Sequence, residues 1–275
     1  MAALRPPVIN VIDKAVRRAG RGLVRDFGEV QELQVSRKGT ADFVTAADLK
    51  AEKTLKEDLS KAHPDWTLHM EESGVSGPPD ALTRWIVDPL DGTTNFIHGI
   101  PHFAISVAVE ESGRITAGAV YHPLTDDFYW AAQGIGAYIN DRRLRVSGRR
   151  RLDESVVATG IPNMGQGDHE RYLATLQAVM GEVASVRRSG SAALDLAYVA
   201  AGRYEGFWEF GLKPWDIAAG LLLVREAGGF ATAIDGATDP LPAGDVLAAN
   251  DRMHQAIGRL LRRAMGLRAP RQMTA

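Results

Sequence analysis

The sequence predicts a mixed α and β protein in which the two halves of the chain are built differently. In the first half, two helical patterns are followed by strand patterns joined by short turns, which is typical of an antiparallel meander. In the second half, strand and helix patterns alternate. With 275 residues the chain can bury a full core, as one large domain or as two closely packed ones.

Composition argues against several classes of protein and several kinds of site. The net charge of −2 argues against a general nucleic-acid binder, which would normally be clearly basic. The absence of cysteine excludes disulfides, thiolate metal sites and cysteine nucleophiles. Residues 1–16 contain charged residues among the apolar ones, so we expect no signal peptide. No apolar run approaches the roughly 18 residues of a membrane span, and we expect a cytoplasmic protein without membrane contact.

The elements of the first half follow from periodicity. Apolar residues at helical spacing predict helices over 7–28 and 46–62, and the segment 38–45 reads as a loop entering a short strand. Thr45 and Asp48 have the spacing of a capping box, so helix capping is the simplest interpretation of Asp48. The remaining strand patterns lie at 66–70, 85–87, 103–110, 115–121 and 128–132.

A basic stretch separates the two halves. It contains Arg142, Arg143, Arg145, Arg149, Arg150 and Arg151. A solvated connection is the favoured interpretation, and contact with a nucleic acid or a protein is the alternative. Beyond it we expect strands at 156–159, around 186, 204–210, 230–234 and 246–249, helices over 170–183, 192–201, 216–227 and 250–265, and a frayed tail after Gly266.

The segment 85–96, WIVDPLDGTTNF, carries the strongest chemical signal. A buried strand runs into Asp88 and Asp91, which would repel each other unless a cation lay between them. We expect Pro89 to stop the strand ladder, because proline has no N–H to donate. Gly92 allows close backbone approach to a ligand, and the Gly-Thr-Thr N–H groups could begin a helix whose N-terminus favours an anion. The segment therefore predicts metal-assisted phosphate chemistry.

Other acids could complete such a site. Glu71 follows a predicted strand, although Glu71-Glu72-Ser73-Gly74 alone is typical of a solvated turn. Asp216 begins a helix rich in small residues, where an ordinary N-cap is the simpler interpretation. A hard cation such as Mg²⁺ prefers such oxygen ligands, and a two-metal displacement would explain four acids. The chain lacks G-x-x-x-x-G-K-[ST] and G-x-S-x-G motifs, which argues against a nucleotide-type P-loop and a serine-hydrolase elbow.

Three segments together resemble the inositol monophosphatase family, in its bacterial inositol-1-monophosphatase form. They are DFVTAAD at 42–48, WIVDPLDGTTNF at 85–96 and KPWDIAAG at 213–220, with Glu71-Glu72-Ser73 between the first two. The resemblance covers roughly residues 8–262. It implies a layered αβαβα sandwich, usually dimeric, with an α+β half at 1–145 that holds most metal ligands and an α/β half at 146–275 for substrate recognition, in one compact unit.

The resemblance also implies roles for individual residues. It assigns two or three Mg²⁺ ions to Glu71, Asp88, the Leu90 carbonyl, Asp91 and Asp216. It assigns preparation of the attacking water to Thr93 with Asp48 behind it. Glu71 counts among the catalytic residues, because a third, weaker Mg²⁺ would rely on Glu71 and water. It assigns phosphate binding to the amides of Gly92, Thr93 and Thr94, and contacts with the inositol ring to Asp91, Gly190, Ser191, Ala192 and Glu209.

The function expected from this resemblance is hydrolysis of myo-inositol 1-phosphate and related sugar or polyol phosphates by metal-activated water, with inhibition by Li⁺. Histidinol phosphate, fructose 1,6-bisphosphate and adenosine 3′,5′-bisphosphate remain alternative substrates. A regulatory partner in RNA metabolism is the alternative of another class, and only the arginine stretch favours it.

Overall fold

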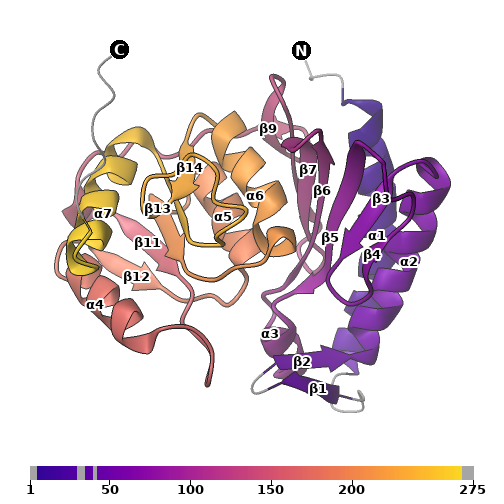
Figure 1. Cartoon of the computed structure of the whole chain (residues 1–275), viewed down its shortest axis with the longest axis horizontal. Helices are drawn as coiled ribbons and strands as arrows, with labels where there is room; N and C mark the ends of the chain where they lie inside the picture. Colours follow the sequence, from indigo (N-terminus) through magenta and orange to yellow (C-terminus); the bar gives the residue numbers. More distant parts are fainter. Residues whose placement is uncertain (1–4, 30–34, 40–41, 268–275) are drawn as a thin grey trace.

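Five layers of secondary structure are stacked across the molecule in the order helix, sheet, helix, sheet, helix (Figure 1). The computed structural model describes residues 5–29, 35–39 and 42–267. Helices α1 and α2 form one outer layer, α5 and α6 the middle one, and α4 and α7 the other outer layer. The predicted layered αβαβα sandwich is therefore confirmed.

The first outer layer consists of α1 (Pro7–Gly28) and α2 (Ala46–Ala62). Proline at the first helical position suits α1, because its fixed φ is already helical and its missing N–H has no partner there in any case. The apolar stripe of α1, including Ile12 and Leu23, is buried against the larger sheet. Both helices match the ranges predicted from periodicity.

The larger sheet has eight strands in the order β10-β9-β8-β7-β6-β5-β3-β4. Their bounds are β3 (Thr67–Met70), β4 (Gly74–Ser76), β5 (Thr83–Asp91), β6 (Ala104–Glu111), β7 (Arg114–His122), β8 (Asp127–Ala132), β9 (Gly136–Ile139) and β10 (Arg142–Arg143). Only β3 and β5 pair in parallel. The meander β6–β7–β8 was predictable, whereas β4, β9 and β10 are too short for a periodic signal.

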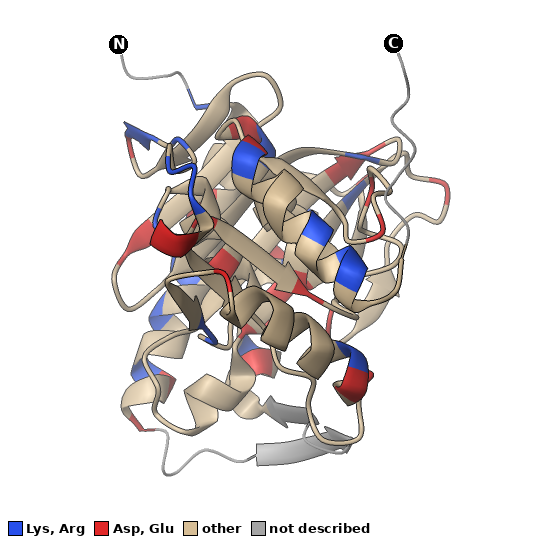
Figure 2. Ribbon diagram, turned by 90° about the vertical axis from the view of Figure 1, so that its left-hand side faces the viewer, with Lys and Arg blue, Asp and Glu red and all other residues tan. Residues whose placement is uncertain are grey.

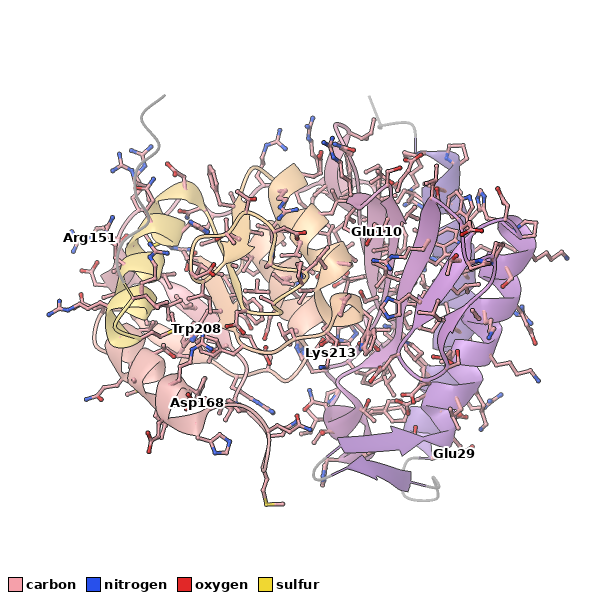
Figure 3. All side chains as sticks on the ribbon, in the orientation of Figure 1. Glu29, Glu110, Arg151, Asp168, Trp208 and Lys213 are labelled. Atoms are coloured by element: carbon pink, nitrogen blue, oxygen red, sulfur yellow. The ribbon has the colours of Figure 1, made fainter. Side chains whose placement is uncertain are left out.

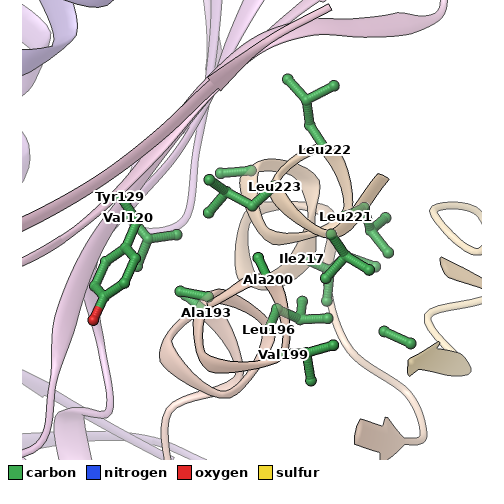
Figure 4. Close-up of a cluster of buried hydrophobic side chains, with 14 of the residues drawn as sticks. Val120, Tyr129, Ala193, Leu196, Val199, Ala200, Ile217, Leu221, Leu222 and Leu223 are labelled. Carbon is green, nitrogen blue, oxygen red and sulfur yellow. The ribbon is translucent and has the colours of Figure 1, made fainter. Parts of the chain in front are cut away.

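The middle layer, α5 (Ala192–Ala200) and α6 (Pro214–Glu226), is apolar on nearly all sides because a sheet covers each face. Figure 4 shows this core, in which Leu196 and Leu221 lie on the helices while Val120 and Tyr129 come from the larger sheet. Gly118 of β7 lets α6 approach closely, since a Cβ there would lie 3.0 Å from the Ala219 Cα atom.

The second sheet has five strands in the order β12-β11-β13-β15-β14. They are β11 (Val156–Thr159), β12 (Ser185–Arg187), β13 (Gly206–Glu209), β14 (Phe230–Ala233) and β15 (Val246–Ala249). Helices α4 (His169–Met180) and α7 (Asp251–Ala264) cover its outer face. Asn250 caps α7 as predicted, because its side chain accepts the N–H of Met253 at 3.0 Å. Helix α4 ends at Met180 rather than at residue 183.

The arginine stretch is only partly an open connection. Arg142 and Arg143 form the edge strand β10, and both side chains are exposed, as expected for a solvated connection. Arg149 forms an ion pair of 2.8 Å with the buried Glu205. The short 3₁₀ helix at Leu152–Glu154 follows before the second sheet begins. The division of the chain at residue 145 stays a prediction.

Two further expectations concern segments next to residues that the structure does not describe. The loop before residue 45 forms a hairpin of β1 (Val35–Gly39) and β2 (Asp42–Thr45), while residues 40 and 41 lie outside the described residues. Most of the tail predicted to fray, residues 268–275, also lies outside them. Among the described helices, none is both long enough and apolar enough to cross a membrane.

Candidate active site

The acids predicted at strand ends are brought together by the parallel pair β3 and β5. Met70 is in register with Val87, so Glu71 follows β3 next to Asp88 in β5. The N–H of Glu71 donates to the carbonyl of Val87 at 3.2 Å and holds the two chain segments together. The carboxyl ends of parallel strands lie at the same edge of a sheet, so this position follows from the topology.

Strand β5 does not stop at Pro89, which corrects the prediction that proline ends the ladder. The strand continues to Asp91, with an irregularity of register between Asp88 and Asp91. A bulge accommodates a residue that cannot donate to the ladder. The N–H of Leu90 donates to Asp88 Oδ1 at 2.9 Å, so the bulge is closed by an acid of the site itself.

A short helix, α3 (Thr93–Ile97), begins directly after β5. Gly92 precedes it with a φ of 97°, which residues with a side chain rarely adopt. A Cβ on Gly92 would also lie 3.1 Å from the His102 carbonyl oxygen and 3.3 Å from that of Gly190. Glycine is therefore required here for both conformation and space.

Asp48 serves as a helix cap and as a partner of Thr93. Its Oδ2 accepts the N–H of Thr45 at 2.9 Å, and the Thr45 side chain accepts N–H groups of the first turn of α2, which completes the capping box. Its other oxygen, Oδ1, accepts the hydroxyl of Thr93 at 3.2 Å. The Thr93 hydroxyl also lies 3.0 Å from the Leu90 carbonyl oxygen. The capping interpretation of Asp48 is therefore confirmed, and its contact with Thr93 is the arrangement that the predicted catalytic role requires.

The start of α5 is tied to the first half of the chain through Asp91. The Asp91 Oδ2 atom accepts the N–H of Ala193 at 2.8 Å and the hydroxyl of Ser191. Ser191 is also the N-cap of α5, since its hydroxyl accepts the N–H of Leu194 at 3.3 Å. Asp91 thereby brings the predicted substrate residues Gly190, Ser191 and Ala192 beside the strand-end acids.

Asp216 enters from the first turn of α6. The helix begins at Pro214 and its N-cap is Lys213, so the prediction of Asp216 as the N-cap is wrong. Asp216 is the third helical residue, and its Oδ2 atom accepts the N–H of Lys213 at 2.7 Å as in a capping box. Figure 3 shows Lys213 near the centre of the molecule, between the two halves. The hydroxyl of Ser106 in β6 donates to the Trp215 carbonyl at 3.0 Å and fixes this helix start against the larger sheet.

Burial and mutual repulsion disturb the ionisation of these acids. Burial raises the pKa of Asp88 well above its usual range, and the charges of Glu71, Asp91 and Asp216 raise it further. Burial and the charge of Asp91 likewise raise the pKa of Asp216, while burial raises that of Asp91 to about 6 against the hydrogen bonds from Ser191 and Ala193. A cation bound between Asp88, Asp91 and Asp216 would offset this burial and repulsion.

The donor set fits a hard divalent cation, because such ions prefer carboxylate and carbonyl oxygens. In the part of the chain that the structure describes, no three Asp, Glu or His side chains are gathered into a ready metal cage. Mg²⁺ is commonly held by one or two carboxylates, with water and substrate oxygens completing its shell. The open arrangement suits an ion that is bound together with a phosphate.

A pocket of about 200 Å³ opens between the two halves. Of the predicted site residues, all but Asp48, Asp88 and Leu90 line it. The predicted residues that line it are Glu71, Asp91, Gly92, Thr93, Thr94, Gly190, Ser191, Ala192, Glu209 and Asp216. The carboxyl group of Glu209, at the end of β13, lies over Gly160, and a Cβ on that glycine would displace it because the two would be 1.9 Å apart.

The sequence patterns do not single out several other pocket residues, including Gly160, Asn163, Arg188 and Asp195. Asp195 could have been noticed in the sequence, because it is the only charged residue in the otherwise apolar helix α5. A fully buried acid in an apolar helix requires an explanation. Arg188 lies in a short basic run before the Gly-Ser-Ala segment, but nothing local distinguishes it from a solvated arginine.

Comparisons with known proteins agree with this geometry. The model of the inositol monophosphatase family matches residues 5–265. The inositol-1-monophosphatase of Rhizobium meliloti (strain 1021) is 54% identical over 259 residues, which cover 94% of this chain and 97% of that protein. The Nus factor SuhB of Escherichia coli (strain K12) is 43% identical over 251 residues, covering 91% and 94% of the two chains.

A solved structure is similar over the same length. The crystal structure of the extragenic suppressor protein suhB from Bartonella henselae superposes with a TM-score of 0.90 at 53% identity, covering 93% of this chain and 98% of that one. Family match, sequence identity and fold therefore agree over nearly the whole chain. This chain belongs to the inositol monophosphatase family and is a phosphatase.

Proposed function

We propose that this protein is a Mg²⁺-dependent phosphomonoesterase that hydrolyses myo-inositol 1-phosphate and related polyol phosphates. The observation that carries the proposal is the grouping of Glu71, Asp88, Asp91 and Asp216, from three separate elements of the chain, beside the start of α3. A relative that is 54% identical is named inositol-1-monophosphatase, which supports the choice of substrate.

The start of α3 provides a phosphate site. The first N–H groups of a helix have no partner within the helix and favour an anion. In this proposal the amides of Gly92, Thr93 and Thr94 bind the phosphate oxygens. The φ of Gly92 turns the chain so that these amides follow directly after Asp91.

The acids would hold two to three Mg²⁺ ions. Glu71, Asp88, Asp91 and Asp216 would supply carboxylate oxygens, and Leu90 would supply its carbonyl oxygen. Bound Mg²⁺ stabilises negative charge on the phosphate and on the leaving oxygen by Lewis-acid action. The family is metal-dependent in general, which supports this assignment.

Thr93 and Asp48 would prepare the attacking water. In this step the water gives a proton to Thr93 Oγ1, while the Thr93 hydroxyl proton passes to Asp48 Oδ1, 3.2 Å away. Burial raises the pKa of Asp48, which makes it a stronger base for such a transfer. The capping bonds from Thr45 hold Asp48 in place during the step.

The alcohol that leaves would be bound by the second half of the chain. Asp91, Gly190, Ser191, Ala192 and Glu209 line the pocket on that side. Carboxylates accept strong hydrogen bonds from hydroxyl groups, and Glu209 is therefore suited to a polyol. A substrate whose alcohol part is aromatic or a nucleotide would form fewer such hydrogen bonds with these residues.

The proposal is tested by phosphate release from a panel of esters. Inositol 1-phosphate, histidinol phosphate, fructose 1,6-bisphosphate and adenosine 3′,5′-bisphosphate are compared by kcat/KM with Mg²⁺ present and absent. We expect the inositol ester to be preferred, Mg²⁺ to be required, Li⁺ to inhibit, and Asp91→Asn to remove nearly all activity. Activity retained in that variant would exclude the metal assignment.

The expected homodimer is measured by sedimentation and the expected cytoplasmic location by cell fractionation.

A second candidate function is contact with RNA or with the transcription machinery. Two observations favour it: the name Nus factor SuhB of a 43% identical relative, and the exposed arginines at 142–151 and on α7. Figure 2 views the outer side of the second half, where basic positions recur along α7. An Asp91→Asn variant that lost phosphatase activity but kept its role in cells would establish this function.

A further inference from the structure

Asp195 is a buried acid that faces the candidate active site. It lies in the first turn of α5, is 1% exposed and lines the pocket together with Glu209. Its Oδ1 atom is buried without a hydrogen-bond partner among the residues that the structure describes. A buried polar atom of this kind costs free energy unless something else satisfies it.

Comparison with Glu205 shows what a structural acid looks like in the same half of the protein. Glu205 is also 1% exposed, but both of its oxygens are satisfied. Its Oε1 accepts from Arg149 at 2.8 Å, and its Oε2 accepts the N–H of Val156 at 2.7 Å. Asp195 lacks such a set of partners, so fold stability alone does not explain it.

The surroundings of Asp195 are acidic on the side of the pocket. Burial raises its pKa well above the usual range, and the charge of Asp91 raises it further, while Ser189 and Arg188 oppose this. Asp195 in turn raises the pKa of Glu209. Two carboxyl groups therefore face one small space, and hydroxyl groups of a ligand would satisfy both.

We propose that Asp195 is a further substrate-binding residue, whose Oδ1 atom receives a hydrogen bond from a hydroxyl group of the leaving polyol, next to the hydroxyl bound by Glu209. This inference rests on the proposed function and extends it to the alcohol side of the substrate. Two neighbouring carboxyl groups recognise a vicinal diol, because each hydroxyl has its own acceptor. Phosphate esters of simple alcohols lack both hydroxyls.

The test compares two esters in one variant. Asp195→Ala is assayed with myo-inositol 1-phosphate and with p-nitrophenyl phosphate, which carries no hydroxyl on its alcohol part. We expect kcat/KM for the inositol ester to fall about 3- to 10-fold, the usual range for a hydrogen bond to a neutral group, mainly through KM. The value for p-nitrophenyl phosphate should stay within about twofold, since only the hydroxyl contact is lost.

Deoxy analogues of inositol 1-phosphate identify the hydroxyl. One analogue should lose as much in the wild type as Asp195→Ala loses with the full substrate, and the variant should no longer distinguish the two. Glu205→Ala is the matched control: it should lower thermal stability without changing the preference between analogues. Asp195→Ala should keep the thermal stability of the wild type or raise it.

An equal loss on both esters, or no loss on either, would overturn the assignment of Asp195. Failure of the proposed function would give a different result, because the wild type itself would then release no phosphate from inositol 1-phosphate. The two failures are thus separated by the wild-type measurement alone.

Discussion

The side-chain amide of Asn95 donates a hydrogen bond of 2.9 Å to the carbonyl of Ser189, although the two residues lie 94 positions apart in the chain. The same amide nitrogen donates to the His102 carbonyl at 2.7 Å. Asn95 is 4% exposed and lies on α3, directly behind the predicted phosphate amides. One side chain therefore connects the phosphate side of the pocket with the segment that carries Gly190 and Ser191.

Asn95→Asp removes both donors at almost unchanged volume, so it should loosen this connection. We expect the free energy of unfolding to fall by about 1–3 kcal/mol, because two carbonyl groups lose their partner and face a carboxyl group. KM for a polyol phosphate should rise more than kcat falls, since the segment that carries Gly190 and Ser191 moves relative to the phosphate site. Denaturant unfolding and steady-state kinetics measure the two effects. Asn10→Asp, on the exposed side of α1, is the matched control and should change neither.

Thr93→Val separates the predicted catalytic role of Asp48 from its capping role. The variant keeps the shape of the side chain but removes the hydroxyl that contacts Asp48 and the Leu90 carbonyl. We expect kcat to fall about 100- to 10,000-fold, as for loss of a general-base relay, with a stability change below about 1 kcal/mol. Thr45→Ala should instead cost about 1 kcal/mol of stability through the lost helix cap. Equal losses of kcat in the two variants would contradict the proposed relay.

The local parts of this site were predictable because their signals are local. Helix periodicity, capping spacing and acids after apolar runs place Asp48 and Asp216 at helix starts and Asp88 at a strand end. The structure has Asp48 and Asp216 in the first turns of their helices, whereas β5 continues beyond Asp88 to Asp91. The layered fold followed from the resemblance of three motifs and is confirmed. The capping box at Thr45 needed only two residues three positions apart.

The remaining parts depend on contacts between distant segments. Asp91 meets the start of α5 across 102 positions, and no local pattern predicts that its carboxyl group would accept an N–H there. The bulge at Pro89 forms because Asp88 and Asp91 both pair with β6, which overrides the preference of proline. In the sequence, Asp195 is only an acid within an apolar helix, and the folded structure is needed to show that it lines the pocket.

Stability of the metal-free protein should fall as pH rises through the range set by Glu209. Burial, with the charges of Asp195 and Asp91, raises the pKa of Glu209 from 4.5 to about 8. Between these values the folded protein holds a proton that the unfolded chain has lost, so folding becomes less favourable with increasing pH and levels off above about 8. Glu209→Gln should flatten the pH dependence of the melting temperature in this range. Parallel curves for the two proteins would contradict the shift.

Gly92→Ala tests whether the turn before α3 requires glycine for space as well as for conformation. Gly113 provides the control: its φ of 79° is also left-handed, but a Cβ there would meet nothing within 4 Å. Gly113→Ala should therefore cost only the conformational term of about 1–2 kcal/mol. Gly92→Ala should cost about 1–3 kcal/mol more, because the added Cβ presses on the carbonyls of His102 and Gly190. Unfolding by denaturant measures both. Displacement of those carbonyls should also raise KM for a phosphate ester in Gly92→Ala alone, whereas equal destabilisation and equal KM in the two variants would show that the close contacts at Gly92 have no consequence.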